Sequence, residues 1–269
     1  SPPGQTRMSV AGASAKGTGY VFDLKKRLYP EVGVPGDGFG AAVALEGDLA
    51  VVGAPLKDAD NVRDAGCAYV FVRRDGRWER TARLTADVPE VNDRFGAAVA
   101  ISGDTILVGA PGKGSVATKI VNGVVVPQYE GVGATYVFIR KGDAWSQQAV
   151  LRRPANERLQ HWALAYDGSA VAIAGDLALV GSTGYYTSDA RGTVRTYQRQ
   201  GENWSTEQFE FIPTNHAGNQ RFGAAIALSG DSVLIGAPTS GVGGQGLVQF
   251  GGAFVFIRKG VKWEQQGGE

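Results

Sequence analysis

The chain has little sulfur, almost no net charge and no long apolar run, and each shortage excludes a class of protein. Its 269 residues include a single cysteine, Cys67, so no disulfide can form within the chain. Lys and Arg number 27 against 26 Asp and Glu, so no overall field attracts nucleic acid or an anionic membrane. No run approaches the roughly 18 apolar residues of a membrane-spanning helix. We therefore expect no nucleic-acid partner and no membrane insertion.

Glycine, by contrast, is abundant, with 40 residues, and it is accompanied by Val, Ala, Thr and aromatic residues. This composition favours many short strands joined by tight turns. The hydrophobic fraction of 43% is ample for a buried core. No Ser- or Pro-rich linker interrupts the chain, so residues 1–269 are interpreted as one all-β domain. The opening Ser1-Pro2-Pro3-Gly4, without Met and a charged segment, is typical of a mature or trimmed soluble product.

One spacing recurs along the chain: a Phe-Gly pair, an Asp nine positions after the Phe, and Gly-Ala-Pro beginning five positions after the Asp. Three copies run from Phe39 to Pro55, from Phe95 to Pro111 and from Phe222 to Pro238. A fourth copy keeps both spacings, although Asp167 stands where the others have Phe. These spacings predict two strands joined by a tight Gly-Asp turn.

A second spacing follows each copy: seven positions separate the last aromatic of a Tyr-Val-Phe type strand from an aromatic across a basic turn. The four pairs that end in Trp are Phe71 and Trp78, Phe138 and Trp145, Tyr197 and Trp204, and Phe256 and Trp263. Near the N-terminus, Gly12-Ala13-Ser14, Tyr20-Val21-Phe22 and Tyr29 continue the series. Each repeat is therefore predicted to contain four strands, A to D.

Strand A, taken to begin at Phe-Gly, has no polar face, so each sheet must be covered on both sides. Stacking the sheets radially as a β-propeller achieves this. We expect about five four-stranded antiparallel blades, at approximately 5–35, 36–90, 91–156, 163–214 and 218–267. The first blade lacks strand A. Three alternatives remain. The first blade has three strands, or another copy of the chain completes it through self-association, or the chain is part of a longer parent protein with a seven-bladed propeller.

These phrases, together with Trp145-Ser-Gln-Gln and Trp263-Glu-Gln-Gln, resemble the bacterial FG-GAP repeats, which are related to the propeller of integrin α-chains. The resemblance implies a β-propeller on an extracellular, periplasmic or cell-surface protein that mediates adhesion or other recognition. It does not identify a ligand.

Long connections are predicted on one face of the propeller, between strands B and C and between strands D and A, and long loops commonly carry function. The longest, Gly112 to Gly133, contains Asn122-Gly123 between apolar runs, which predicts a protruding hairpin. The hairpin is either a partner contact or a simple variant in loop length.

The fourth repeat gathers aromatic and polar residues suited to binding a protein or glycan. The candidate ligand-binding residues are His161, Trp162, Tyr166, Asp167, Tyr185, Tyr186, Asp189 and Arg191. The alternative is structural, with Trp162 or Tyr166 filling the space that the missing Phe leaves.

One acidic loop is a candidate metal site, because closely spaced carboxylates could offer several oxygens to Ca²⁺. Its residues are Asp58, Asp60, Asn61 and Asp64. It lies between strands B and C, whereas the integrin-type calcium loop lies between A and B, so a solvated acidic loop is the alternative. No other cofactor is expected.

The predicted C to D turns are basic. They hold Lys25, Lys26, Arg27, Arg73, Arg74, Arg77, Arg140, Lys141, Arg199, Arg258, Lys259 and Lys262. This ring of charge would suit an anionic glycan or an acidic partner, or it would serve only solubility, as charged hairpin turns commonly do.

Catalysis is not expected. A propeller glycosidase needs two carboxylates a few ångströms apart, and Asp167 is the only acid in strand A of any repeat. His161 and His216 lie in different repeats. The sequence therefore favours a non-catalytic recognition module. The alternatives are a structural or assembly propeller and a carbohydrate-active enzyme.

Overall fold

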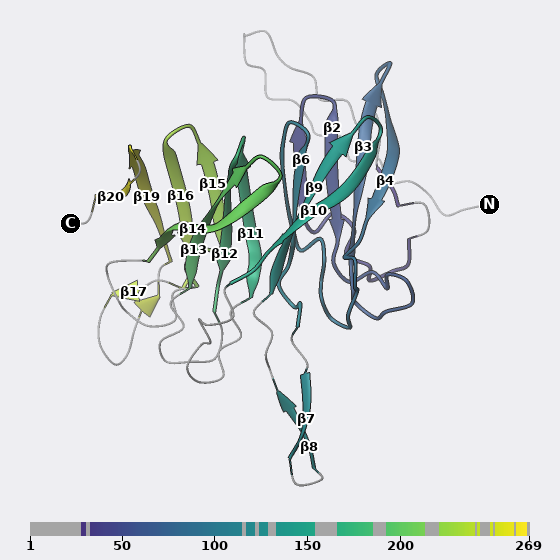
Figure 1. The fold of residues 1–269 in the computed structure, drawn as a ribbon, viewed down its shortest axis with the longest axis horizontal. Helices are drawn as coiled ribbons and strands as arrows, with labels where there is room; N and C mark the ends of the chain where they lie inside the picture. Colours follow the sequence, from purple (N-terminus) through teal and green to yellow (C-terminus); the bar gives the residue numbers. More distant parts are fainter. Residues whose placement is uncertain are drawn as a thin grey trace, which may run out of the picture.

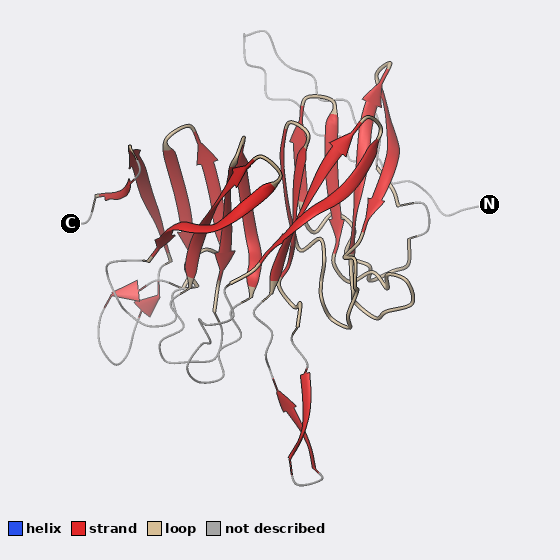
Figure 2. Ribbon diagram, in the orientation of Figure 1, coloured by secondary structure: helices blue, strands red, loops and turns tan. Residues whose placement is uncertain are grey.

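The computed structural model describes most of the chain, and every regular element in the described part is a β-strand (Figures 1 and 2). The described residues are 28–30, 33–114, 117–121, 124–128, 133–153, 166–184, 192–212, 221–239, 241–242, 248–249, 251–260 and 262–267. Across these ranges, no helix is long and apolar enough to cross a membrane.

The strands form four antiparallel sheets of four strands each, and each sheet follows the chain as a meander. The first sheet contains β1 (Val43–Glu46), β2 (Leu49–Ala54), β3 (Cys67–Arg74) and β4 (Arg77–Leu84). The second contains β5 (Ala98–Ser102), β6 (Thr105–Ala110), β9 (Ala134–Lys141) and β10 (Ala144–Leu151). The third contains β11 (Asp167–Ala174), β12 (Leu177–Ser182), β13 (Thr193–Gln200) and β14 (Asn203–Phe211). The fourth contains β15 (Ala225–Ser229), β16 (Ser232–Ala237), β19 (Gly252–Lys259) and β20 (Lys262–Gln266).

This arrangement confirms the predicted all-β propeller with four-stranded blades. The four sheets lie within the last four predicted ranges, whereas most of the range 5–35 predicted for a first blade lies outside the described residues.

Consecutive sheets pack face to face, with their first strands β1, β5, β11 and β15 adjacent in that order. In strand B of each sheet, alternate side chains point toward the sheet before it and the sheet after it. In the core between the first two sheets, Val51 of β2 lies with Ile106 and Val108 of β6. We call the side of a sheet toward the next sheet along the chain its following face, and the opposite side its preceding face. Each buried aliphatic side chain contributes about 1.5–3 kcal/mol to stability.

Glycines explain how closely the sheets approach one another. A Cβ on Gly53 of β2 would collide with the backbone carbonyl of Gly96, which precedes β5. The same collision would occur between Gly109 and Gly168, and between Gly181 and Gly223. Each contact between neighbouring sheets thus joins the Gly of Gly-Ala-Pro in one sheet to the Gly of Phe-Gly in the next. In the third sheet, Gly181 of Gly-Ser-Thr and Gly168 of Asp167-Gly168 take these two positions.

Two expectations about strand A were wrong. Phe-Gly precedes the strand as a turn in three sheets: Gly40 has a φ of 93° and donates to the Gly53 carbonyl at 2.9 Å, and β1 begins only at Val43. Nor are all faces covered, because Val43 and Leu45 are 70% and 69% exposed. Sheets two to four each have a preceding sheet among the described residues, and the first sheet does not.

The two edges of the sheets differ. Strands A to B and C to D are joined by two residues each, as at 47–48 and 75–76, and we call this side the turn edge. The longer connections lie on the opposite side, the loop edge. There, β7 (Ala117–Val121) and β8 (Val124–Gln128) pair as the hairpin predicted at Asn122-Gly123, and it projects away from the sheets (Figure 1). A shorter pair, β17 (Gly241–Val242) and β18 (Val248–Gln249), lies in the fourth sheet's B to C connection.

Candidate functional site

The basic residues of the turn edge are largely engaged within their own sheets. Arg73 Nε donates to Asp48 Oδ1 at 2.6 Å, and its guanidinium lies 5.7 Å from the centre of the Trp78 ring. The same arrangement recurs in the next two sheets as Arg140 with Asp104 and Trp145, and as Arg199 with Asp176 and Trp204. In the fourth sheet Arg258 lies over Trp263, and its backbone N–H donates to the Asp231 carbonyl. These four arginines therefore connect the A to B turn with strands C and D, which favours the structural interpretation of the ring of charge.

At the loop edge, two ion pairs link the Asp before Phe-Gly to a Lys after Gly-Ala-Pro. Asp37 and Lys57 lie 3.0 Å apart, and Asp93 and Lys113 lie 3.1 Å apart. Burial raises the pKa of Asp37, but the Val34 N–H and Lys57 outweigh it and hold that pKa below its usual value. Burial prevails at Asp93 and raises its pKa. The Asp and the Lys are separated by the same number of residues in both pairs. This repeated spacing was present in the sequence, but sequence reasoning did not identify it.

The junction between the second and third sheets replaces aromatic packing with charge. In the first two sheets the Phe before strand A packs on a Tyr of strand C: Phe39 on Tyr69 at 5.6 Å and Phe95 on Tyr136 at 5.2 Å between ring centres. In the third sheet Asp167 takes the Phe position. The strand pairings place Arg195 at the position of Tyr136, since these residues oppose Val180 and Val108 respectively.

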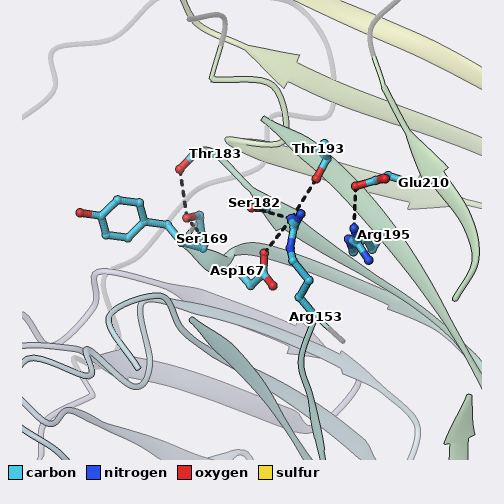
Figure 3. A network of polar contacts seen from close by, with 9 residues as sticks. Arg153, Asp167, Ser169, Ser182, Thr183, Thr193, Arg195 and Glu210 are labelled. Atoms are coloured by element: carbon cyan, nitrogen blue, oxygen red, sulfur yellow. Dashed lines mark hydrogen bonds and ion pairs between the residues drawn. The ribbon is translucent and has the colours of Figure 1, made fainter. Parts of the chain in front are cut away.

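Arg153 completes this polar junction and holds four chain segments together (Figure 3). Its guanidinium donates to Asp167 Oδ1 at 3.4 Å, to Ser182 Oγ at 3.3 Å and to Thr193 Oγ1 at 3.4 Å. Arg153 lies two residues after the end of β10. Asp167 is the first residue of β11, Ser182 is the last residue of β12, and Thr193 is the first residue of β13. The connections 154–165 and 185–191 therefore leave from and return to segments that one side chain joins.

Further contacts extend the network away from Arg153. Arg195 pairs with Glu210 of β14 at 3.1 Å, and the hydroxyls of Ser169 and Thr183 lie 3.2 Å apart (Figure 3). We define the polar junction as Arg153, Asp167, Ser169, Ser182, Thr183, Thr193, Arg195 and Glu210.

Burial makes the polar junction costly to maintain. The side chains of Arg153 and Asp167 are only 8% and 3% exposed. Asp167 Oδ2 and Arg153 Nε are buried without a hydrogen-bond partner among the described residues. Burial raises the pKa of Asp167, although Arg153, Ser182 and Arg195 oppose the shift. Buried ion pairs seldom gain more than their desolvation costs, so this junction is not explained by stability.

Two of the predicted ligand-binding residues can be placed. Asp167 lies inside the polar junction, and Tyr166 precedes it with a φ of 58° and a carbonyl that accepts from Ser169 Oγ at 2.6 Å. The other six, His161, Trp162, Tyr185, Tyr186, Asp189 and Arg191, lie outside the described residues. They belong to the two connections whose ends Arg153 joins.

Sequence reasoning missed Arg153 and Arg195, which meet Asp167 only in the fold. A signal for Arg195 existed, because it occupies the position of Tyr69 and Tyr136 in the strand C repeat. Arg153 likewise follows Leu151 by two residues, as Ala86 follows Leu84 in the first sheet. Aligning the repeats position by position would have shown three polar substitutions together.

A pocket of about 260 Å³ lies at the loop edge beside the polar junction. Its lining includes Glu90, Lys113, Gly133 and Arg152, and Gly133 forms a parallel β-bridge to Asp167. Lys113 in this pocket is also paired with Glu90 at 3.1 Å. The pocket can therefore receive a small polar group adjacent to the polar junction.

The predicted calcium ligands do not gather into one site. Asp58 Oδ1 accepts from the backbone N–H of Asp64 at 3.0 Å, and Asp60 pairs with Arg83 at 3.1 Å. Asp60, Asn61 and Asp64 all have positive φ, which fits a tightly turning loop. Within the described residues, no three His, Cys, Asp or Glu side chains are placed to hold a metal ion. Calcium binding at this loop remains a hypothesis that calorimetry would test.

Comparison with known proteins identifies the repeat. The model of the FG-GAP repeat family matches residues 22–71, 78–138 and 204–256, which is more than half of the chain. No curated protein matches the sequence. Among solved structures, the crystal structure of the computationally designed Ika4 protein is similar at 14% identity with a TM-score of 0.42, over 81% of this chain and 89% of that chain.

Proposed function

Since the chain belongs to the FG-GAP repeat family, we propose that it is a non-catalytic recognition module that binds a protein or glycan at the loop edge of the third sheet. The observation that carries the proposal is the Arg153 guanidinium, which joins the ends of both connections that hold the predicted aromatic ligand-binding residues. Fixing the two ends of a binding loop lowers the entropy lost on binding, and the Arg153 contacts hold these ends together.

The charges of the polar junction support recognition rather than catalysis. Acid and base catalysis on a sugar needs one carboxyl group to donate a proton and a second to act as base or nucleophile. Here Asp167 faces Arg153, and Glu210 faces Arg195. Each carboxylate is neutralised by its own arginine, and members of this family are generally not catalysts. FG-GAP repeat proteins are typically extracellular or on the cell surface, and we propose the same location for this chain.

The test is a binding screen with Tyr185→Ala/Tyr186→Ala against the unaltered chain, using a glycan array and a pull-down of surface proteins. We expect the double variant to lose at least 10-fold in affinity, because truncating two aromatic anchors costs more than about 1.4 kcal/mol. Its melting temperature should stay unchanged. Tyr29→Ala is the matched control, since Tyr29 is exposed far from these loops in sequence.

Either of two results would reject the proposal. A large fall in melting temperature would show that the two tyrosines fill the core rather than contact a ligand. Full binding by the double variant would place recognition elsewhere on the molecule. An array hit alone identifies a glycan ligand, and a pull-down hit alone identifies a protein.

A further inference from the structure

The junction between the following face of the second sheet and the preceding face of the third opens outward into a groove. Because the first strands of neighbouring sheets are adjacent, the sheets diverge toward their last strands, here β10 and β14. A pocket of about 280 Å³ lies between these two strands. One wall is formed by residues 148–152, at the end of β10, and the other by Tyr197 and residues 202–204. The groove is therefore built by strands rather than by the long connections of the loop edge.

The groove follows the outer edge of β10 rather than one of its faces. Side chains alternate between the two faces of a strand, so a groove on one face would be lined by every second residue. Here the five consecutive residues 148–152 line it. β10 is the last strand of its sheet, so its outer row of backbone N–H and C=O groups has no partner strand among the described residues. At about 3.3 Å per residue, this wall is roughly 16 Å long, the length of a short strand.

Trp204 forms a fixed wall opposite β10. Its indole N–H donates to Gln148 Oε1 at 3.0 Å, and the Arg199 guanidinium lies 5.5 Å from the centre of its ring. The pairing of β10 with β9 shifts register at Gln148, and such an irregularity commonly re-aims a side chain. Residues 149–151 pair regularly with β9 beyond this point. The groove therefore combines regular strand geometry on one side with a held aromatic ring on the other.

The two ends of the groove carry opposite charges. Arg152 lies where the chain leaves β10 toward the loop edge, and Glu202 lies in the two-residue connection between β13 and β14 at the turn edge. Both residues are exposed, and neither forms an ion pair within the described part of the chain. A ligand that lies along the groove therefore meets a positive charge at one end and a negative charge at the other.

We propose that this groove binds an extended peptide segment of a partner protein, which adds as a strand to the outer edge of β10. In this mode, main-chain hydrogen bonds to the sheet edge supply affinity, and the flanking side chains supply specificity. Antiparallel pairing is slightly more stable per residue than parallel pairing, so the peptide runs opposite to β10. Its N-terminal end then lies at Arg152 and its C-terminal end at Glu202. The groove therefore selects about five residues that begin with an acidic residue and end with a basic one.

The probe is the peptide acetyl-Asp-Thr-Val-Thr-Lys-amide, and titration calorimetry with the unaltered chain measures its affinity. We expect saturable binding. The charge-reversed peptide acetyl-Lys-Thr-Val-Thr-Asp-amide should bind about 10-fold more weakly, because it places like charges at both ends of the groove.

Two further peptides test strand addition itself. One carries N-methyl groups at both Thr residues, and the other carries them at Val and Lys. Only alternate N–H groups of an added strand face the edge that it joins. One of these two peptides should therefore lose binding by about 10-fold while the other retains it.

Charge exchange in the protein tests the direction of the peptide. The variant Arg152→Glu/Glu202→Lys keeps the net charge of the chain and should prefer the charge-reversed peptide by about 10-fold. Asp143→Lys is the matched control, because Asp143 has in the second sheet the turn position that Glu202 has in the third, and it does not line the groove. This control should keep the preference of the unaltered chain. Since all three residues are exposed, the melting temperatures should agree within a few degrees.

Three outcomes overturn the inference. Absence of saturable binding would mean that the groove takes no peptide. Equal binding of the original and the charge-reversed peptide would show that Arg152 and Glu202 do not select the ligand. Equal effects of the two N-methylated peptides would exclude strand addition at β10. The result is independent of the loop edge, because Tyr185→Ala/Tyr186→Ala should bind the original peptide like the unaltered chain.

Discussion

The junction between the first two sheets and the junction between the second and third share one backbone and differ in chemistry. Both bring a glycine of strand B against the glycine before or at the start of the next strand A: Gly53 against Gly96, and Gly109 against Gly168. The first then packs Ala86, Phe95 and Tyr136 together. The second places Arg153, Asp167 and Arg195 at the same three positions. The propeller thus fixes the spacing of its sheets with glycine and leaves the adjoining side chains free to change as a set.

The difference is one of energetic cost, because the polar junction buries charge where the other junction buries aromatic rings. An aromatic pair such as Phe95 and Tyr136 contributes about 0.5–1.5 kcal/mol beyond its buried area. A buried ion pair must first overcome the loss of hydration of both ions. The polar junction also lies where the candidate ligand-binding connections begin and end, which is consistent with a role in recognition.

The largest effect is expected from breaking the polar junction on one side. Arg153→Ala leaves the buried Asp167 carboxylate without its counterion, and such unpaired charges cost about 3–5 kcal/mol. The free energy of unfolding, measured in denaturant, should fall by that amount. Arg152→Ala is the matched control: the neighbouring arginine is exposed, and its removal should change stability by less than about 0.5 kcal/mol. Equal effects for the two variants would refute the assignment of Arg153.

A smaller effect of opposite sign is expected from converting the polar junction into the apolar one. The triple variant Arg153→Ala, Asp167→Phe and Arg195→Tyr installs the side chains of the first junction on the same backbone. Replacing buried ionic groups with packed apolar residues is often neutral or stabilising by about 1–4 kcal/mol. Asp167→Phe alone should be strongly destabilising, since it leaves Arg153 without its carboxylate. A triple variant less stable than that single variant would show that the junctions are not interchangeable.

The smallest effect concerns how the free energy of unfolding depends on pH, and it should have opposite signs at Asp167 and at Asp37. Burial raises the pKa of Asp167, so the folded protein keeps the Asp167 proton to a higher pH than the unfolded chain does. The contribution of Asp167 to stability therefore falls as pH rises from the ordinary Asp pKa through the raised one. The pKa of Asp37 is lowered, so its contribution is present above the ordinary value and is lost as pH falls.

Unfolding measured from pH 3 to pH 7 would separate the two aspartates. In the unaltered protein, Asp167 makes the free energy of unfolding fall with rising pH, and Asp167→Asn should abolish that fall. Asp37 makes the free energy of unfolding rise with pH, and Asp37→Asn should abolish that rise. Parallel profiles for the two variants would contradict the opposite environments assigned to them.

Much of the architecture could be read from spacing, because the repeat records contacts that are local in sequence. The positions of Asp48 and Trp78 identified the unit and its turns, and Asn122-Gly123 identified the β7–β8 hairpin. The start of strand A was misplaced, since Phe-Gly is apolar like a strand but turns at Gly40. The bond from Arg73 to Asp48 was missed, because counting basic residues says nothing of their partners.

The sequence by itself therefore determined the four-stranded unit, its repetition and the edge that carries the long connections, since turn length and side-chain alternation depend on neighbouring residues. Only the tertiary structure decided that Arg153 bonds to Thr193, 40 residues away, across the boundary between two sheets. It also decided that Trp204 of the third sheet donates to Gln148 of the second and so forms a wall of the groove beside β10. Both facts depend on which sheet lies beside which, and no local spacing encodes that.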